Sequence, residues 1–395
     1  GSPWTRGGGL DRPKFKLPGD RLFRAHDHMY YDIDPAGGNF HNRVTRYWLY
    51  LMGYPVNENE IVRVIINNYG IDIREDTEPV HNDFVSRSFR DGNRGHLYRV
   101  DDEWWFMDNW ERDSQDADWR YKGSENPGRY RTEWMKRSNE VEDDFTHLIS
   151  FFKLMSANPL NTSAIERVLD IDALLKYTVV RGYIADWDTF TMGRGKNCFF
   201  YERPDGKFQF LHWDSDLGFG DPNSGFYGGR VAPLIDRPVY KRRFHYWLGQ
   251  FHENFSKNSL RFETWLQAEE DASRSYSSNP AFYTNYCNSR AAAVLRELGK
   301  SYTAKLDLKS LNPSNLVTNE TVTITGTAPS TLYSVRFLPD PGTNFVWRDE
   351  SSWRASKLPL KAGTNHFEIQ GLDINGKVVS RAGTDIVRTN ALGGP

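Results

Sequence analysis

The feature of this sequence that most constrains its fold is a pair of short apolar segments joined by a tight turn. Residues 197–201 and 207–212 are rich in aromatic side chains, and the residues between them include Pro, Asp and Gly. These are residue types that turns favour, so the pattern predicts a β-hairpin. A hairpin returns the chain to the edge at which it began. We therefore expect Asn197 and Asp214 to lie at the same edge of a sheet.

Acidic side chains gather on both sides of this predicted hairpin. Asp188 precedes it, Asn197 opens it, and Asp214 and Asp216 follow it. Carboxylate and amide oxygens are hard ligands, suited to Mg²⁺ or Ca²⁺. Protein kinases use the same order: a catalytic-loop Asp, an Asn, and a metal-binding Asp ahead of a Gly. The ordered set predicts a site for a metal and phosphates, although any single Asp is more simply explained as a solvated cap of a turn.

Basic residues near the N-terminus are candidates for contacts with phosphates. Strand alternation over 12–17 places Lys14 and Lys16 on one face. We expect one of these lysines to form an ion pair with Glu78, like the Lys–Glu pair of kinases. The glycine run at 7–9 predicts either a loop that cradles phosphates with its backbone N–H groups or a flexible tail.

Residues 1–305 combine helical and strand patterns. Apolar spacing predicts helices over 41–52 and 141–152. A capping-box pattern at 163–166 predicts a helical region that runs to about residue 185. Helices that accompany strands in this way are typical of an α+β domain.

The composition changes near residue 305, which predicts a second domain over 306–395. Short runs such as 321–325 alternate Thr with Val and Ile, and the Asn-Gly pair within 373–376 is a strong hairpin signal. Several short strands at this spacing predict an Ig-like β-sandwich. This domain carries no evident catalytic set, so we expect it to act as a spacer or a binding module.

Composition excludes several classes of protein. Lys and Arg number 50 against 52 Asp and Glu, for a net charge of −2, whereas a nucleic-acid binder would carry a basic surface. No apolar run approaches the roughly 18 residues that a membrane span needs. The two cysteines, Cys198 and Cys287, exclude a disulfide scaffold. Each has a packing reason to be buried, so we expect two free thiols.

Several blocks of residues match the pattern of one known family. They are Trp187, Asp188 and 197–201; 213–216 with Gly218 and Gly220; 65–68 with Gly70 and Glu78; and 95–98. In these blocks the chain resembles the CotH kinase-like family, named for the bacterial spore-coat protein H, over most of residues 1–300. The resemblance implies an atypical protein-kinase-like fold and ATP-dependent phosphorylation of Ser or Thr hydroxyls in a protein. It also implies a divalent metal: Mg²⁺, Mn²⁺ or Ca²⁺.

Carried over by position, the resemblance implies a role for each candidate residue. Asp188 would be the catalytic Asp. Asn197 and Asp214 would hold the metal, with Asp216 competing for the place of Asp214. The nucleotide side would be formed by basic residues and one acidic partner: Lys14, Lys16, Glu78 and Arg99.

The chain also departs from the family pattern, which leaves a second hypothesis open. Arg99 stands where the family often has Lys, and the two are not interchangeable at a catalytic position. The gap from Asp188 to Asn197 is longer than in the kinase motif. The alternative is a degenerate kinase-like protein that binds a glycan or surface partner through its sandwich or an aromatic patch. The patch, which core packing would also explain, contains Trp104, Trp105, Phe106, Trp110 and Trp119.

Location is the last expectation that the sequence supports. A β-sandwich that follows a catalytic domain is common outside the cell. The family resemblance implies bacterial surface, spore or secreted settings. We therefore expect an extracellular or cell-surface protein.

Overall fold

The computed structural model describes residues 14–21, 23, 28–32, 40–67, 70–101, 116–256, 264–268, 279–311 and 315–389. The chain forms two compact units. Unit 1 comprises Gly1–Ala232 and Asn254–Arg290, and unit 2 comprises Pro233–Glu253 and Ala291–Pro395. Helices accompany several antiparallel sheets, so the α+β class expected from the sequence is confirmed. Within the described ranges, no helix has both the length and the apolar character needed to cross a membrane.

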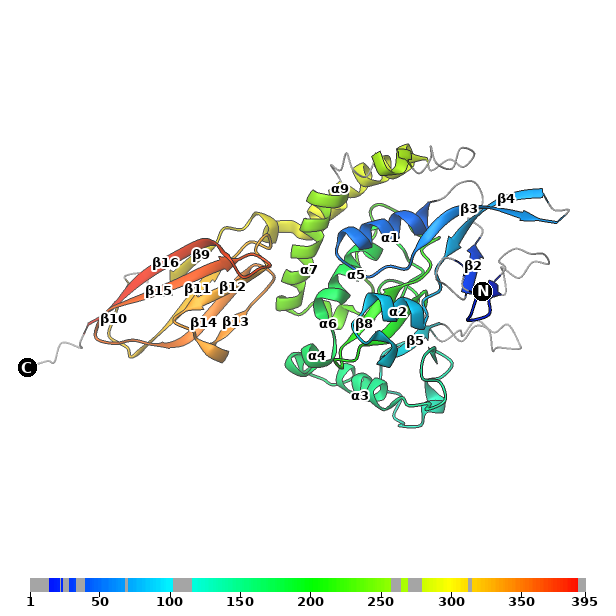
Figure 1. The fold of residues 1–395 in the computed structure, drawn as a ribbon. Helices are drawn as coiled ribbons and strands as arrows, with labels where there is room; N and C mark the ends of the chain where they lie inside the picture. The colour runs from blue at the N-terminus through cyan, green and yellow to red at the C-terminus, as the bar shows by residue number, and fades with distance from the viewer. Residues whose placement is uncertain are drawn as a thin grey trace, which may run out of the picture. The chain divides into compact units, whose positions relative to one another are not determined.

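Unit 1 begins with a four-stranded antiparallel sheet in the order β1-β2-β4-β3. Its strands are β1 (Lys14–Lys16), β2 (His28–Asp32), β3 (Asn59–Ile66) and β4 (Gly70–Thr77). Helix α1 (His41–Leu51) lies between β2 and β3 in the chain, close to the predicted bounds of 41–52. Figure 1 shows β3 and β4 as a long hairpin beside α1.

A second antiparallel sheet holds the predicted hairpin and has the order β6-β5-β7-β8. Its strands are β5 (His96–Val100), β6 (Trp134–Lys136), β7 (Cys198–Glu202) and β8 (Phe208–His212). Every residue of β7 and β8 is buried, because helices cover both faces. On one face α2 (Asn82–Ser88) contributes Phe84 and Val85 to an apolar cluster with the strands. On the other, Tyr177 of α5 (Ile171–Tyr183) stacks on Phe210 at 5.7 Å. Figure 1 shows this layering.

The remaining helices of unit 1 correct two expectations from the sequence. Helix α3 (Thr146–Met155) starts later than predicted and leaves Val141 exposed. The predicted helical region from 163 to 185 is two helices, α4 (Thr162–Val168) and α5. The chain leaves the helical conformation at Leu169 and Asp170, and the Asp170 backbone N–H donates to Phe208 O of β8 at 2.9 Å. The Asp170 carboxylate then caps α5, which a search for apolar periodicity does not detect.

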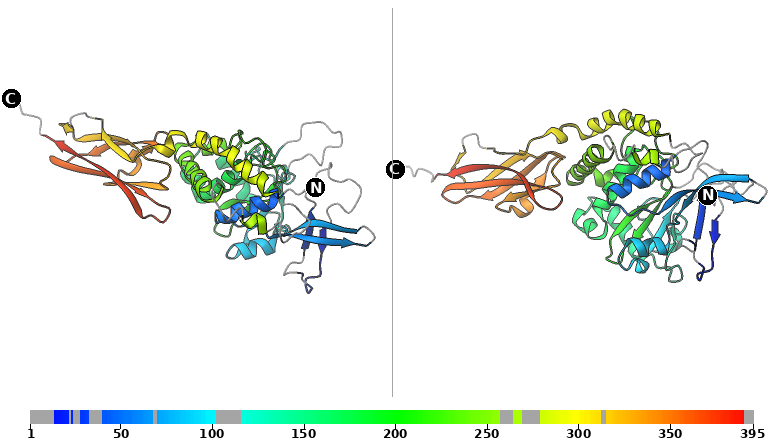
Figure 2. Two further views of the ribbon diagram at one scale, coloured as in Figure 1. Left: turned by 90° about the horizontal axis from the view of Figure 1, so that it is seen from above. Right: turned by 45° about the horizontal axis from the view of Figure 1, so that its top comes forward.

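Unit 2 contains two four-stranded sheets that share one apolar core. One has the order β13-β14-β11-β9 and the other β10-β16-β15-β12; Figure 2 shows them as two layers. Ile324, Trp353, Phe367 and Ile386 are among the core residues. The strands are β9 (Asp307–Ser310), β10 (Leu316–Val317), β11 (Thr321–Thr327), β12 (Ser334–Leu338), β13 (Phe345–Trp347), β14 (Ser352–Pro359), β15 (Gly363–Leu372) and β16 (Val378–Arg388).

Unit 2 also includes helical segments that precede the strands in the chain. These come from α6 (Ala232–Ile235), α7 (Pro238–Phe251) and the end of α9 (Pro280–Thr303). The buried guanidinium of Arg242 on α7 donates to Ala328 O at 3.0 Å, Pro329 O at 2.6 Å and Leu332 O at 2.8 Å. It also lies 4.5 Å from the ring centre of Trp347. Burial lowers the pKa of Arg242 to about 10, so the group keeps its charge at neutral pH.

Replacing Arg242 with Ala should destabilise unit 2, because two buried carbonyl oxygens and one part-buried carbonyl oxygen would lose their donor. Leaving a buried polar group unpaired costs roughly 1–3 kcal/mol, so we expect a loss of about 3 kcal/mol or more in the free energy of unfolding. Urea denaturation followed by Trp fluorescence measures it. The control is Arg381→Ala, since Arg381 is exposed and lies 3.6 Å from Glu368, and its effect should stay within about 0.5 kcal/mol. Equal denaturation midpoints for the two variants would contradict the role of Arg242.

Candidate functional site

The strand register brings the acidic segments to one edge of the second sheet. Val100 of β5 pairs with Cys198 of β7, which pairs with His212 of β8. The residues next to these three at this edge are Asp101, Asn197 and Trp213. Asp214 follows at once, so the structure brings Asn197 and Asp214 together. Asp101 joins the same edge, and sequence reasoning missed it because its strand lies about a hundred residues earlier.

Asp188 and Asn197 are in direct contact. The Asn197 amide Nδ2 donates to Asp188 Oδ2 at 2.8 Å and to the Asp188 backbone O at 2.9 Å. Lys196 Nζ lies 3.3 Å from the same Oδ2. Asp188 Oδ1 is buried and has no hydrogen-bond partner among the described residues. The arrangement fixes Asp188 Oδ2 and leaves Asp188 Oδ1 able to accept a proton. Asn197 uses only its NH₂ group in these contacts.

The long gap between Asp188 and Asn197 is a closed loop. Phe190 N donates to Lys196 O at 3.1 Å, and Gly193 N donates to Trp187 O at 3.0 Å. Gly195 packs against the backbone of Ala117, and a Cβ added at Gly195 would lie 2.1 Å from Ala117 O. Glycine is therefore required there. The insertion relative to the kinase motif does not prevent the two ends from meeting.

A buried ion pair between Arg181 of α5 and Asp186, which lies just beyond the helix, connects the two acidic segments. Arg181 Nη2 lies 2.5 Å from Asp186 Oδ2 and donates to Asp214 O at 2.7 Å, while Nη1 donates to Trp213 O at 3.2 Å. Asp186 Oδ1 accepts from Asp188 N at 3.2 Å. Burial raises the pKa of Asp186 to about 6, against the opposing effect of the Arg181 charge. One guanidinium thus positions both the loop of Asp188 and the stretch that carries Asp214.

The segment after the hairpin is held by backbone contacts as well as by side chains. Asp216 N donates to Asp214 Oδ1 at 3.3 Å, and His41 Nδ1–H donates to Asp216 O at 3.0 Å. Ser215 N donates to Asn42 Oδ1 at 2.6 Å. Asp214 and Asn197 have φ of 44° and 54°, a left-handed conformation that Asp and Asn tolerate better than most residues. The residue types at the two positions therefore suit the backbone as well as the chemistry.

The charges of this cluster affect Asp188. Burial is the main cause that raises the pKa of its carboxyl group, the Lys196 charge lowers it, and the Asp214 charge raises it. Asp214 is thus one of the acids whose charge acts on Asp188; Asp186 is another acid that is coupled to it.

The available donors suit a metal held together with phosphates. No group of three or more His, Cys, Asp or Glu in the described ranges is arranged to hold a metal by itself. Asn197 and Asp214 provide an amide oxygen and a carboxylate at one sheet edge. Mg²⁺ is usually bound by one or two carboxylates plus substrate phosphates, so this small set fits.

Only some of the side chains expected on the nucleotide side lie in the described part of the chain. Arg99 lies on β5, two residues from this sheet edge, and its Nη2 is 2.8 Å from Asp101 Oδ2. Lys16 is exposed on β1. The side chain of Lys14 and the glycine run at 7–9 lie outside the described part of the chain.

A cation that the structure shows beside Glu78 is Arg87. Its Nη2 lies 2.5 Å from Glu78 Oε2, which also accepts from Glu58 N at 2.8 Å. Arg87 lies nine residues further along the chain, on α2. An ion pair between Glu78 and a lysine of β1 remains a prediction.

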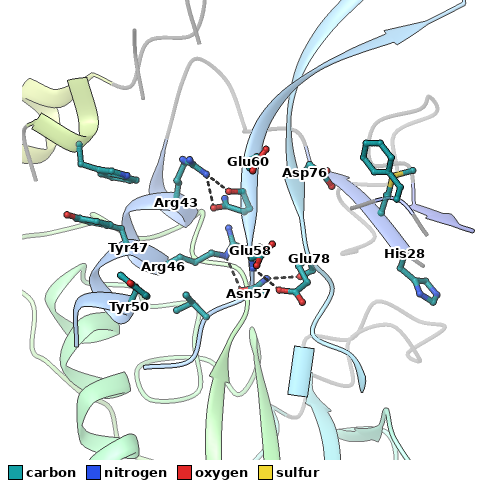
Figure 3. A pocket seen from close by; sticks show the side chains of 15 residues that line it. His28, Arg43, Arg46, Tyr47, Tyr50, Asn57, Glu58, Glu60, Asp76 and Glu78 are labelled. Atoms are coloured by element: carbon teal, nitrogen blue, oxygen red, sulfur yellow. Dashed lines mark hydrogen bonds between the residues drawn. The ribbon is translucent and has the colours of Figure 1, made fainter. Parts of the chain in front are cut away.

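A pocket of about 280 Å³ lies between α1 and the start of β3 (Figure 3). Arg46 Nε donates to Asn57 Oδ1 at 3.1 Å in its wall, and Tyr47 stacks on Trp265 at 4.2 Å. Asp188, Asn197 and Asp214 do not line it. Its described lining includes four carboxylates and two guanidinium groups: Glu58, Glu60, Asp76 and Glu78, with Arg43 and Arg46.

The aromatic patch expected from the sequence is placed only in part. Trp119 is 3% exposed and packs edge-on against Phe151 at 5.8 Å and Phe190 at 5.4 Å. It is therefore a core residue and cannot contribute to a stacking surface. The other members, 104–106 and 110, lie outside the described residues. Cys198 and Cys287 are both buried free thiols, as expected.

Replacing Arg181 with Met should leave the Asp186 carboxylate buried without its charge partner. Breaking a buried pair costs about 3–5 kcal/mol, whereas replacing both partners costs much less. We expect this loss in the free energy of unfolding of Arg181→Met and a partial recovery in Arg181→Met/Asp186→Asn, by urea denaturation. Arg131→Met, which removes an exposed pair with Asp143, serves as the control at under about 1 kcal/mol. A double variant no more stable than Arg181→Met would contradict the analysis.

No curated protein shows a significant similarity to the chain. The family model described as CotH kinase protein matches residues 40–248, more than half of the 395 residues. The match contains Glu78, Arg99 and the whole cluster around Asp188, while β1 and the sandwich lie outside it. The chain therefore belongs to the CotH kinase family.

Proposed function

We propose that the protein transfers the γ-phosphoryl group of ATP to Ser or Thr hydroxyls of a protein substrate, with the help of a divalent metal. The observation that carries this proposal is the contact of Asp188 with Asn197 beside Asp214, at one sheet edge. Kinases place a catalytic Asp, an Asn and a metal-binding Asp in the same order. Membership of the CotH kinase family supports kinase-like phosphotransfer in general.

Asp188 would act as the proton acceptor. Its Oδ2 is fixed by Asn197 and Lys196, which leaves Oδ1 for the acceptor hydroxyl. As the hydroxyl oxygen bonds to the γ-phosphorus, its proton passes to Asp188 and the bond from that phosphorus to ADP breaks. Burial raises the pKa of Asp188, which makes the carboxylate a better base.

Asn197 Oδ1 and the Asp214 carboxylate would hold Mg²⁺, Mn²⁺ or Ca²⁺. A bound ion of this kind neutralises the phosphate charge that develops during transfer. We favour Asp214 over Asp216 because its charge acts on Asp188 and Arg181 fixes its backbone. Lys14, Lys16 and Arg99 are our candidates for contacts with phosphates, and Glu78 is our candidate for their acidic partner.

We extend the proposal to the two parts of the chain. Residues 1–305 would form the kinase-like domain, and 306–395 an Ig-like module that acts as a spacer or binds a partner. We propose a location outside the cell or on a bacterial surface.

One observation favours a second candidate function. Arg99, which stands where the family often has Lys, is engaged by Asp101. A degenerate kinase-like protein that binds a surface partner or glycan would tolerate this. Thermal melting with ATP and Mg²⁺ separates the two functions. A ligand at 100 times its Kd stabilises by roughly 2.7 kcal/mol, so a catalytic protein should show a clear rise in Tm at millimolar nucleotide.

Loss of the proposed catalytic oxygens should abolish phosphoryl transfer. We expect Asp188→Ala and Asp214→Ala each to lower labelling of a Ser/Thr peptide pool by radioactive ATP at least about hundredfold, because positioning and charge neutralisation supply most of the catalysis. Asp205→Ala is the matched control, since Asp205 is an exposed acid in the turn between β7 and β8. Labelling that persists in both site variants would contradict the assignment.

The acid limb of the pH–rate profile should depend on Lys196. Asp188 must be deprotonated to accept a proton, and burial already raises its pKa above the ordinary value of 3.8. The Lys196 charge opposes that rise, so Lys196→Met should raise the pKa further and move the acid limb to higher pH. Lys196→Arg keeps the charge and should leave the limb near its original position. An acid limb that does not move in Lys196→Met would argue against Asp188 as the base.

A further inference from the structure

A single carboxylate joins two segments on which the proposed site depends. Asp116 Oδ1 accepts from Arg194 Nε at 2.8 Å, and Asp116 Oδ2 accepts from Arg230 Nη2 at 2.8 Å. Arg194 belongs to loop 188–197, which carries Asp188 and Asn197. Arg230 lies at the end of segment 214–231, which begins with Asp214. Each oxygen of Asp116 therefore holds a different part of the site.

Backbone contacts complete this junction. Arg230 Nη1 donates to Gly193 O at 3.0 Å, and Arg230 Nε donates to Ala117 O at 2.9 Å. Ala117 N donates to Gly195 O at 3.2 Å, and Trp119 Nε1 donates to Arg230 O at 3.0 Å. Three segments that lie far apart in the sequence thus share one network, and every nitrogen of the Arg230 guanidinium is used.

The ion pairs within the network are partly buried. The side chains of Asp116, Arg194 and Arg230 are 19%, 30% and 16% exposed. Charge-assisted hydrogen bonds in such places are stronger than exposed surface pairs, and a planar guanidinium also fixes direction. Asp116 is therefore suited to fix geometry, which is what phosphoryl transfer requires.

In regulated kinases, phosphorylation creates a similar link between segments of the active site. Phosphorylation of their activation loop adds a negative group that pairs with arginines and orders the loop. Here the negative group between two arginines is a side chain of the chain itself. We propose that Asp116 is a positioning residue that substitutes for such a phosphate and holds loop 188–197 and segment 214–231 in the active arrangement without modification. This inference rests on the proposed kinase function.

Asp116→Asn tests the proposal, because it keeps the size of the side chain and removes the charge. We expect kcat to fall roughly ten- to hundredfold, the scale of catalytic misplacement, with KM for ATP nearly unchanged. Asp116→Glu should recover part of kcat. The control is Asp118→Asn, since Asp118 is two residues away and pairs only with the exposed Arg120 among the contacts that the structure shows. A kcat equal to that of the unchanged protein in Asp116→Asn would overturn the proposal.

Two further measurements separate this inference from the proposed function. Phosphatase treatment of the unchanged protein should leave its kcat unaltered, and a loss of activity would show that modification is needed and would refute the inference. Hydrogen exchange of amides in 191–195 should become faster in Asp116→Asn and stay unchanged in Asp118→Asn. The exchange result does not depend on activity. If the unchanged protein labels no peptide, the proposed function fails, while faster exchange would still establish the structural junction.

Discussion

The buried ion pair of Arg181 and Asp186 is the constraint on which the rest of the site depends. Taking a guanidinium out of water costs several kcal/mol unless its donors and its charge are satisfied. Arg181 is fully buried, so Asp186, Trp213 O and Asp214 O must stay within reach of it. The same requirement fixes where the loop of Asp188 starts and where Asp214 lies after the end of β8. The chemistry of the site thus depends on satisfying one buried charge.

The sheet and this ion pair position different parts of the site. The β7–β8 hairpin sets the distance across the edge, because its register leaves Asn197 and Trp213 side by side. The ion pair then fixes the positions of the two irregular segments beyond the edge, because Arg181 contacts Asp186 in one of them and the carbonyls of Trp213 and Asp214 in the other. Loop 188–197 can be longer than in the kinase motif because its own hydrogen bonds and the contacts with Asp116 and Arg230 hold its middle, while Asp186 and Asn197 position its ends. A length that sequence comparison treats as a departure therefore has little effect on the site.

The parts of the structure that the sequence predicted well are those encoded locally. The β7–β8 hairpin, α1 and the strands β11 and β15–β16 follow from alternation, apolar spacing and turn residues. The break between α4 and α5 was missed because it depends on a hydrogen bond from Asp170 to Phe208 in a distant strand. Asp116 was missed for a similar reason, since its partners lie about 80 and 110 residues away. Arg181 did leave a local signal, a cation among the buried residues of the second half of α5, which apolar periodicity alone does not take into account.

At three separate places in this chain, a buried arginine donates hydrogen bonds to the backbone carbonyls of an irregular segment. Arg181, Arg242 and Arg290 are at most 2% exposed, and each donates to backbone carbonyls of segments that are neither helix nor strand. Arg290 illustrates the extreme case, with five carbonyl acceptors, two at the end of α5 and three in residues 222–225. Irregular segments inside a protein carry carbonyls that no ladder satisfies. A lysine has three donors on one atom and could not span such a set, whereas the planar five-donor fork of arginine can. The long irregular connections near the site are thus compatible with a rigid interior, because arginine side chains donate the hydrogen bonds that a helix or sheet would otherwise supply to these carbonyls.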